Sequence, residues 1–362
     1  TDRSVSTAST FVKILRKGLM DYKRLLLYCL IVLTISWSLG CSSGISQTGM
    51  PVKINGVNFV STRSAIDSAD VIPIVNIKGN FLAAIPYGFI NGNRSTVYYD
   101  TDRQWYGETV AGTVNIVQEA QKQGLQVMIK PHIWVGGQGW AGDFELSGEE
   151  NWREWERQFD AYILTYAKLA DSLDVEIFCM ATEFRKVVQK RPQYWQKLIT
   201  KIRKVYSGQL TYAANWDNYQ EVTFWDQLDF IGIDAYFPLV HEPTPSVDQL
   251  KKEWQTIHSE LRSLSEKHGK KILFTEYGYQ SVDLGAGKHW EIDLRSGPVN
   301  EEVQANAYEA LYEVFWAEKW FAGGFLWKWY PNHQRAGGPD NKRFTPQNKL
   351  AEEVITTYYG KN

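Results

Sequence analysis

Two glutamates close apolar segments of the sequence, where a carboxyl group is costly to bury unless it is paired or functional. Glu183 comes after the apolar run 177–181 and a threonine, and Glu276 comes after the run 272–274 and a threonine. Glycoside hydrolysis requires two carboxyl groups, one to protonate the leaving oxygen and one to attack the sugar or activate water. The pair therefore predicts a glycosidase, although either glutamate alone is equally consistent with a salt-bridged residue at a strand end.

The neighbours of the two glutamates predict different roles. Glu183 follows apolar residues and precedes Phe184, which disfavours the charged form, raises the pKa and suits a proton donor. Glu276 precedes Tyr277, and Tyr236 ends the neighbouring predicted strand. A tyrosine hydroxyl that donates to Glu276 would keep it ionised and oriented, as a nucleophile requires. Packing in the core is the competing explanation for Tyr236.

Polar residues at other strand ends are candidates for contacts with sugar hydroxyl groups. His132 follows a proline at the end of one strand, and Asn215 and Asp217 end another. Arg63 lies just past the first strand and is a further candidate. A structural histidine with satisfied hydrogen bonds explains His132 equally well.

Tryptophans fall into two groups by their spacing. Five have helical spacing and are expected to pack against the core: Trp152, Trp155, Trp195, Trp254 and Trp316. Six lie at strand ends or in loops: Trp134, Trp140, Trp216, Trp290, Trp327 and Trp329. Because the apolar faces of pyranose rings stack on indole, the second group predicts a sugar-binding cleft. We assign substrate contacts to Trp134, Trp216, Trp327 and Trp329, with Trp329 as the floor beneath the bound sugar.

Short apolar runs alternate with amphipathic stretches along the chain, which predicts βα units and a parallel sheet. The expected strands are 54–61, 81–87, 126–135, 175–184, 209–217, 228–237, 271–279 and 323–330. The expected helices are 113–123, 149–171, 192–205, 247–267, 301–319 and 346–359, with a weaker pattern in 62–80. Eight strands separated by helices favour an α/β fold of the closed (β/α)₈ (TIM) barrel type, in which strand ends carry the chemistry. A doubly wound sheet is the alternative, but the first strand lacks its glycine-rich phosphate loop.

The composition limits the classes of function. The chain has 362 residues and a net charge of −2, with no long basic tract that would indicate nucleic-acid binding. Hydrophobic residues make up 44% and charged residues 22%, as in globular proteins. Acidic residues in the loops 136–147 and 280–298 match no compact ligand loop, so we predict no metal and no cofactor. One catalytic domain spanning 53–362, acting as a monomer, is the expectation.

The N-terminal segment has the features of an export signal. Basic residues at 23 and 24 precede the apolar run 25–40, which is short for a membrane span. Cys41 follows Trp-Ser-Leu-Gly (37–40), an arrangement that resembles a bacterial lipobox, in which the cysteine sulfur is lipidated. We therefore predict an upstream extension and lipoprotein signal peptide in 1–40, a short tether in 41–52, and a lipid-anchored protein of the bacterial cell envelope, periplasmic or surface-exposed. An ordinary signal peptide or a single anchor helix is the alternative.

Three segments carry a resemblance to a known family. Val-Met-Ile-Lys-Pro-His (127–132), Glu-Ile-Phe-Cys-Met-Ala-Thr-Glu-Phe (176–184) and Phe-Thr-Glu-Tyr-Gly-Tyr (274–279) resemble glycoside hydrolase family 113. The resemblance implies a retaining β-1,4-mannanase acting on mannan or glucomannan, with Glu183 as acid/base and Glu276 as nucleophile. Retaining enzymes hold these groups about 5–5.5 Å apart. Many members of the wider clan have Asn before the acid/base, where this chain has Thr182.

Two alternatives to a mannanase stay open from the sequence. The substrate could be another β-glycan, such as a glucan or a hexosamine polymer. The chain could also be a non-catalytic glycan-binding lipoprotein on a degenerate barrel, although the presence of both carboxyl groups disfavours this. Release of reducing sugar from soluble mannans would separate the enzyme from the binding protein.

Overall fold

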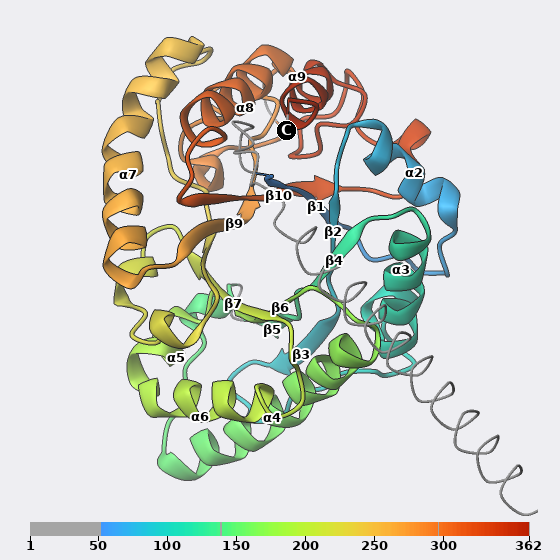
Figure 1. Cartoon of the computed structure of the whole chain (residues 1–362), viewed down its shortest axis with the longest axis vertical. Coiled ribbons are helices and arrows are strands. Elements are labelled where there is room, and N and C mark those ends of the chain that lie inside the picture. The colour runs from blue at the N-terminus through green and yellow to red at the C-terminus, as the bar shows by residue number, and fades with distance from the viewer. Residues whose placement is uncertain (1–51, 138–139, 296, 362) are drawn as a thin grey trace, which may run out of the picture. The chain divides into compact units, whose positions relative to one another are not determined.

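Eight parallel strands close into a barrel in the computed structural model, which describes residues 52–137, 140–295 and 297–361 (Figure 1). Around the barrel the strands are paired in the order β1, β10, β9, β8, β7, β6, β4, β2. They are β1 (Ile54–Phe59), β2 (Phe81–Ala84), β4 (Gln126–Ile129), β6 (Ile177–Thr182), β7 (Gln209–Asn215), β8 (Phe230–Asp234), β9 (Lys271–Tyr277) and β10 (Phe321–Trp329). The predicted (β/α)₈ barrel is confirmed, and a doubly wound sheet is excluded because this sheet has no open edge.

Helices cover the outside of the barrel, as Figure 1 shows. Each buries an apolar stripe; in α4, Trp152, Trp155 and Phe159 recur at helical spacing and are buried. The described α-helices are α2 (Ser68–Asn76), α3 (Val110–Lys122), α4 (Glu149–Ser172), α5 (Arg185–Lys190), α6 (Pro192–Ile202), α7 (Val247–His268), α8 (Glu301–Phe315) and α9 (Leu350–Tyr359). The five tryptophans with helical spacing are all buried, as predicted. The short helix α5 was not predicted.

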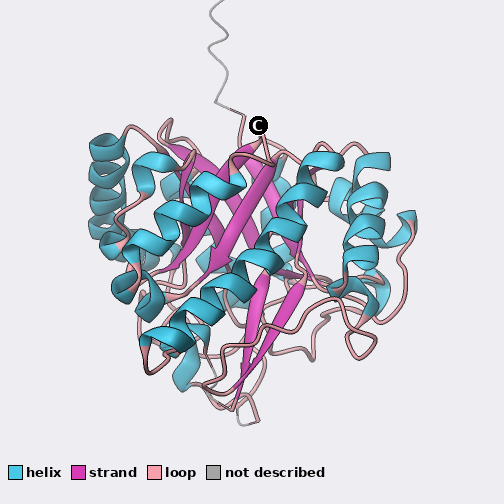
Figure 2. Ribbon diagram, turned by 90° about the horizontal axis from the view of Figure 1, so that it is seen from below, coloured by secondary structure: helices cyan, strands magenta, loops and turns pink. Residues whose placement is uncertain are grey.

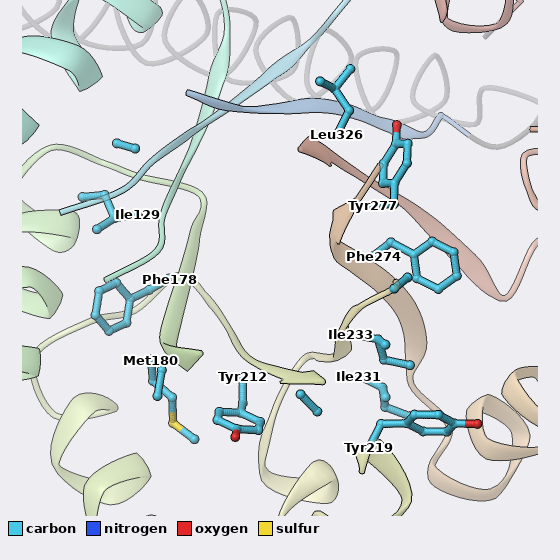
Figure 3. Close-up of a cluster of buried hydrophobic side chains, with 14 of the residues drawn as sticks. Ile129, Phe178, Met180, Tyr212, Tyr219, Ile231, Ile233, Phe274, Tyr277 and Leu326 are labelled. Carbon is cyan, nitrogen blue, oxygen red and sulfur yellow. The ribbon is translucent and has the colours of Figure 1, made fainter. Parts of the chain in front are cut away.

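Two layers of apolar side chains hold the barrel together. Because side chains alternate across a strand, Ile177 and Cys179 of β6 belong to the layer inside the barrel. Phe178 and Met180 of the same strand point outward, toward the helices (Figure 3). The inner layer also contains Phe81, Ala83, Met128, Ala213, Phe230, Leu273, Ala322 and Phe325. The barrel interior is thus packed with apolar groups, and the polar groups of the site lie at the carboxyl ends of the strands.

A two-stranded parallel sheet extends from the carboxyl ends of β2 and β4. It consists of β3 (Tyr87–Asn91) and β5 (His132–Gly136), and it projects beyond the end of the barrel (Figure 2). The single strand predicted over 126–135 is therefore wrong: β4 ends before Lys130, and Pro131, which has no N–H to donate, separates β4 from β5. His132 N–H donates to the carbonyl of Pro86 at 2.9 Å and begins the new pairing. This sheet places His132 and Trp134 on one face, two residues apart.

The N-terminal predictions fall outside the part of the chain that the structure describes. The predicted signal peptide in 1–40, Cys41 and all but the last residue of the predicted tether lie there. Within the described ranges, no helix combines the length and apolar composition that crossing a bilayer requires.

Candidate active site

The carboxylate of Glu276, near the end of β9, is held by groups from several neighbouring elements. Its Oε2 accepts a hydrogen bond from the Tyr236 hydroxyl at 2.6 Å, the contact expected from the sequence. Its Oε1 accepts one from the ammonium of Lys130, and Nε2 of His132 lies 3.5 Å from the same oxygen. Burial and the charge of Glu276 raise the pKa of Tyr236, so the phenol keeps the proton that it donates. These contacts give the Glu276 carboxylate charge-assisted hydrogen bonds and fix its direction.

Beneath Glu276 lies a layer of buried polar side chains. Lys130, which directly follows β4, is fully buried and donates to Oδ1 of Asp234 at 3.1 Å. The Thr275 hydroxyl donates to the same oxygen at 2.7 Å. Burial alone would lower the pKa of Lys130, but the charges of Asp234 and Glu276 outweigh it and raise the pKa, so the ammonium stays charged. Burial and then the charge of Glu276 raise the pKa of Asp234 to about 7.

Glu183 has a different environment. It directly follows β6 and has a left-handed backbone conformation with φ of 56°, while its N–H donates to the carbonyl of Ala213 at 2.8 Å. Its Oε2 accepts a hydrogen bond from the indole N–H of Trp140. Burial, followed by the charges of Asp234 and Glu276, raises the pKa of Glu183 well above its ordinary value, although the Trp140 bond opposes this. A carboxyl group that keeps its proton in this way can act as a general acid.

A cavity of about 450 Å³ lies at the carboxyl ends of the strands. Neither glutamate lines it; it approaches Glu276 through Tyr87, whose ring centroid lies 5.3 Å from that of His132. Its walls come from β1, the small sheet, β10 and the loops that follow β1 and β2, and its lining includes Tyr87, Trp105, Glu108, Trp134, Trp327 and Lys328. The Trp327 ring is parallel to the ring of His132, with centroids 6.0 Å apart, and His132 reaches Glu276. Trp134 is 59% exposed. Arg63 lies beside this cavity, with its guanidinium 5.0 Å from the Trp105 ring centroid.

A second aromatic surface follows β7. The Trp216 ring stacks on the half-exposed Trp290 ring, with centroids 5.7 Å apart and an interplanar angle of 15°. Nearby, the Asn215 amide donates to the Asp217 carboxylate at 2.9 Å. The Arg185 guanidinium lies between the two sites: one of its nitrogens is 3.5 Å from an oxygen of Asp217, and its central carbon is 4.9 Å from the Trp140 ring centroid. This surface is therefore connected through Arg185 and Trp140 to Glu183.

Trp329 is not the floor of the cleft. Its side chain is fully buried in the layer between the barrel and the helices. Along the β1–β10 pairing, Val57 opposes Leu326 and Phe59 opposes Trp329, so β10 contains one extra residue. This bulge breaks the two-residue alternation and turns Trp329 to the same outer side as Leu326. Trp327 lines the cavity instead.

Comparison with known proteins identifies the family. The model of Glycoside Hydrolase Family 113 matches residues 74–349, which contain both glutamates. The chain belongs to this family. It is therefore a glycoside hydrolase, and the family 113 chain carries two carboxyl groups in the contrasting environments described above. A search of curated proteins found no match.

Solved structures with the same fold include other family 113 members. The GH113 β-mannanase AaManA from Alicyclobacillus acidocaldarius, in complex with ManMIm, matches with a TM-score of 0.74 and 23% identity over 87% of this chain and 98% of that one. A GH113 β-1,4-mannanase solved as a complex matches with a TM-score of 0.71 and 22% identity, over 86% and 100% of the two chains. A β-glucuronidase from Faecalibacterium prausnitzii has a TM-score of 0.56, 16% identity, and coverage of 86% and 49%. At these identities the likeness establishes the barrel fold.

The structure brings most of the predicted residues to one place and adds others. Glu183, Glu276, His132, Tyr236 and Trp327 gather at the carboxyl ends of the strands, with Asn215 and Trp216 on one side and Trp134 on the other. The sequence alone assigns no role to Lys130 and Asp234. Each is a charged residue that ends an apolar run, which is the same signal that indicates the two glutamates. Among the described residues no group of three or more histidine, cysteine, aspartate or glutamate side chains is arranged to hold a metal ion.

Proposed function

We propose that this family 113 chain is a retaining endo-β-1,4-mannanase that cleaves mannan or glucomannan. The proposal rests on the different environments of the two carboxyl groups. Glu276 is stabilised as an anion by Lys130 and Tyr236, whereas burial keeps the proton on Glu183. Two carboxyl groups in different environments are typical of acid/base and nucleophile assignments. Two of the similar solved structures are family 113 β-mannanases, which supports the substrate class.

The reaction proceeds in two displacements. Glu276 attacks the anomeric carbon while Glu183 gives its proton to the leaving oxygen, so that the glycosidic bond breaks and a glycosyl ester forms. Glu183, now ionised, then takes a proton from water, whose oxygen attacks the same carbon and displaces Glu276. Each step inverts the anomeric centre, and two inversions restore the starting configuration. Proton NMR of the first product should therefore show the substrate's anomer, and the opposite anomer would contradict this mechanism.

Aromatic surfaces on both sides of the carboxyl groups support internal cleavage of a polymer. The cavity beside Trp327 and Trp134 is suited to sugar units on one side of the cleaved bond. The stacked pair of Trp216 and Trp290 offers indole faces on the Glu183 side, where a leaving sugar would lie. Rings that stack on apolar sugar faces bind successive units without requiring a particular hydroxyl pattern.

A polysaccharide panel tests the substrate. The enzyme and a Glu276→Gln control are incubated with mannan, glucomannan, cellulose, xylan and chitosan, and reducing ends and product lengths are measured over time. We expect mannan and glucomannan to give oligosaccharides of several lengths at early times, and the control to give none. Preferred cleavage of xylan, cellulose or chitosan would overturn the substrate, and release of monosaccharide alone would overturn the internal mode of cleavage.

We also propose that the enzyme acts as a monomer tethered to the bacterial cell envelope through lipid on Cys41. The proposal is supported by the apolar run 25–40, which ends in Ser-Leu-Gly immediately before Cys41. Several acyl chains give a stable anchor, whereas one gives marginal attachment. Cys41→Ala should move the protein from the membrane fraction to the soluble fraction with unchanged activity per molecule. Unchanged retention in the membrane fraction would contradict lipidation.

A further inference from the structure

The ammonium of Lys130 joins two carboxylates that come from adjacent strands. Lys130 is fully buried and donates both to Glu276 on β9 and to Asp234, the last residue of β8. Asp234 is itself fully buried, and its other oxygen, Oδ2, has no hydrogen-bond partner among the described residues. Thr275 fixes the shared oxygen of Asp234 from the neighbouring strand. Lys130, Asp234 and Glu276 thus form one contiguous network, with Lys130 and Asp234 beneath the Glu276 carboxylate.

The groups that face Glu276 come from every neighbouring element. Two carboxyl groups face it, those of Glu183 and Asp234. Two phenols do so as well, those of Tyr236 and Tyr87. The basic residues that contact it are Lys130 and His132. Burial, and then the charges of Lys130 and Lys328, hold the pKa of His132 well below its ordinary value, so His132 is neutral. Within the described part of the chain, Lys130 is therefore the fully buried cation available to Glu276.

Formation of the glycosyl ester changes this charge balance. Glu276 loses its negative charge when its oxygen bonds to the anomeric carbon, while Lys130 keeps its positive charge. A buried charge without a partner is strongly destabilising. Asp234 is the carboxylate that remains in contact with Lys130 at that stage.

We propose that Lys130 and Asp234 are positioning residues that act through Glu276, with Asp234 serving as the counterion of Lys130 while Glu276 carries the sugar. Lys130 stabilises the Glu276 carboxylate before attack and again as it leaves. Asp234 balances the positive charge of Lys130 between those two steps, while Glu276 is esterified. Neither residue exchanges an atom with the substrate. The inference rests on the double displacement proposed above.

The experiment follows the trapped intermediate at about pH 8, where Asp234, with a pKa of about 7, is ionised in both states and no proton moves at that group. A 2-deoxy-2-fluoro-β-mannosyl fluoride, whose leaving group needs no acid, traps the ester, and hydrolysis of the trapped ester is timed. Lys130→Met should slow this hydrolysis by about tenfold or more, because the departing carboxylate loses its cation. Asp234→Asn should slow trapping but speed hydrolysis several-fold, because release of Glu276 restores a partner to Lys130.

A second readout is the rate at which the ester forms. Lys130→Met should slow trapping as well as hydrolysis, because the Glu276 carboxylate loses the cation that contacts it before attack and again as it leaves. Lys53→Met is the matched control: Lys53 is also buried, but it donates to the carbonyls of Glu318 and Phe321 near the start of β10. This control should change neither the trapping rate nor the hydrolysis rate.

The outcomes separate this inference from the proposed function. Equal slowing of hydrolysis in Lys130→Met and Asp234→Asn would show that the two residues are merely structural. If either single variant fails to fold, the double variant Lys130→Met/Asp234→Asn, which has no unpaired cation, should still hydrolyse the ester slowly, and a wild-type rate would overturn the inference. Mass spectrometry of the labelled peptide in the unmodified enzyme tests the proposed function itself, since a label on a residue other than Glu276 would contradict the nucleophile.

Discussion

The surroundings of Glu276 and Glu183 differ in charge, although both glutamates lie at the same face of the barrel. Glu276 is contacted by the ammonium of Lys130 and the phenol of Tyr236. The side chain of Glu183 accepts a hydrogen bond from the indole N–H of Trp140, and burial followed by neighbouring carboxyl groups raises its pKa. The adjacent strand ends therefore surround two residues of the same type differently, with a cation and a phenol at Glu276 and a raised pKa at Glu183. Substitution of either glutamate, or of its surroundings, should change activity in a different way.

The largest effects are expected from removing the two carboxyl groups themselves. Glu276→Ala removes the nucleophile, so activity on every substrate should fall by on the order of 10⁴-fold or more. Glu183→Ala removes the proton donor, so substrates with poor leaving groups should lose about 10²–10⁴-fold, while an activated aryl mannoside should still form the intermediate. Steady-state rates on mannan and on the aryl mannoside give both numbers.

Azide separates the two variants further. In Glu276→Ala it should attack in place of the carboxylate and give a glycosyl azide of inverted configuration. In Glu183→Ala it should attack the glycosyl ester and give a retained azide. If the configurations are exchanged, the roles of the two glutamates are exchanged as well.

An intermediate effect is expected at Trp327, which reaches the surroundings of Glu276 through His132. Loss of one stacking ring costs about 1–3 kcal/mol by analogy with base–aromatic stacking, so Trp327→Ala should lose about 10- to 100-fold in kcat/KM on mannan. The matched control is Trp329→Phe, in the buried outer layer. It should lower Tm and leave kcat/KM within about twofold, because core substitutions act through packing. A larger kinetic loss in Trp329→Phe than in Trp327→Ala would show that Trp329, and not Trp327, contacts the substrate.

Much of the barrel and the reacting pair could be predicted from local pattern. Each strand and helix has its own pattern of apolar residues within a short segment, so their alternation predicts the (β/α)₈ fold without knowledge of which strands pair. Glu183 and Glu276 are predicted because each interrupts an apolar run. The hydrogen bond from Tyr236 to Glu276 followed from the expected adjacency of two strands, and it is present in the structure.

The remaining features depend on register or on contacts distant in sequence. The bulge that buries Trp329 is a property of the β1–β10 pairing and leaves no mark in either strand alone. The break at Pro131 lies inside a continuous strand-like pattern, so β5 was merged with β4. Lys130 and Asp234 are 104 residues apart, and their ion pair exists only because β4 and β8 face the same barrel interior. Each residue alone could be read only as a polar strand end.

The smallest effect is expected at Trp140, the hydrogen-bond donor to Glu183. This bond favours the ionised carboxylate and so opposes the rise in the pKa of Glu183. Trp140→Phe should therefore raise that pKa further and move the alkaline limb of kcat/KM to higher pH by about one to two units, since a hydrogen bond to a charged group is worth about 1.5–3 kcal/mol.

The acidic limb should stay in place in Trp140→Phe, because the indole N–H of Trp140 donates to Glu183. Trp316→Phe is the control, because it removes an indole N–H that donates to Asn55 at 2.9 Å, away from both glutamates. Its profile should match that of the unmodified enzyme. An alkaline limb that moves to lower pH in Trp140→Phe, or a shift of both limbs together, would mean that the protonation of Glu183 is not set by the environment described here, and the contrast between the two carboxyl groups would then need another cause.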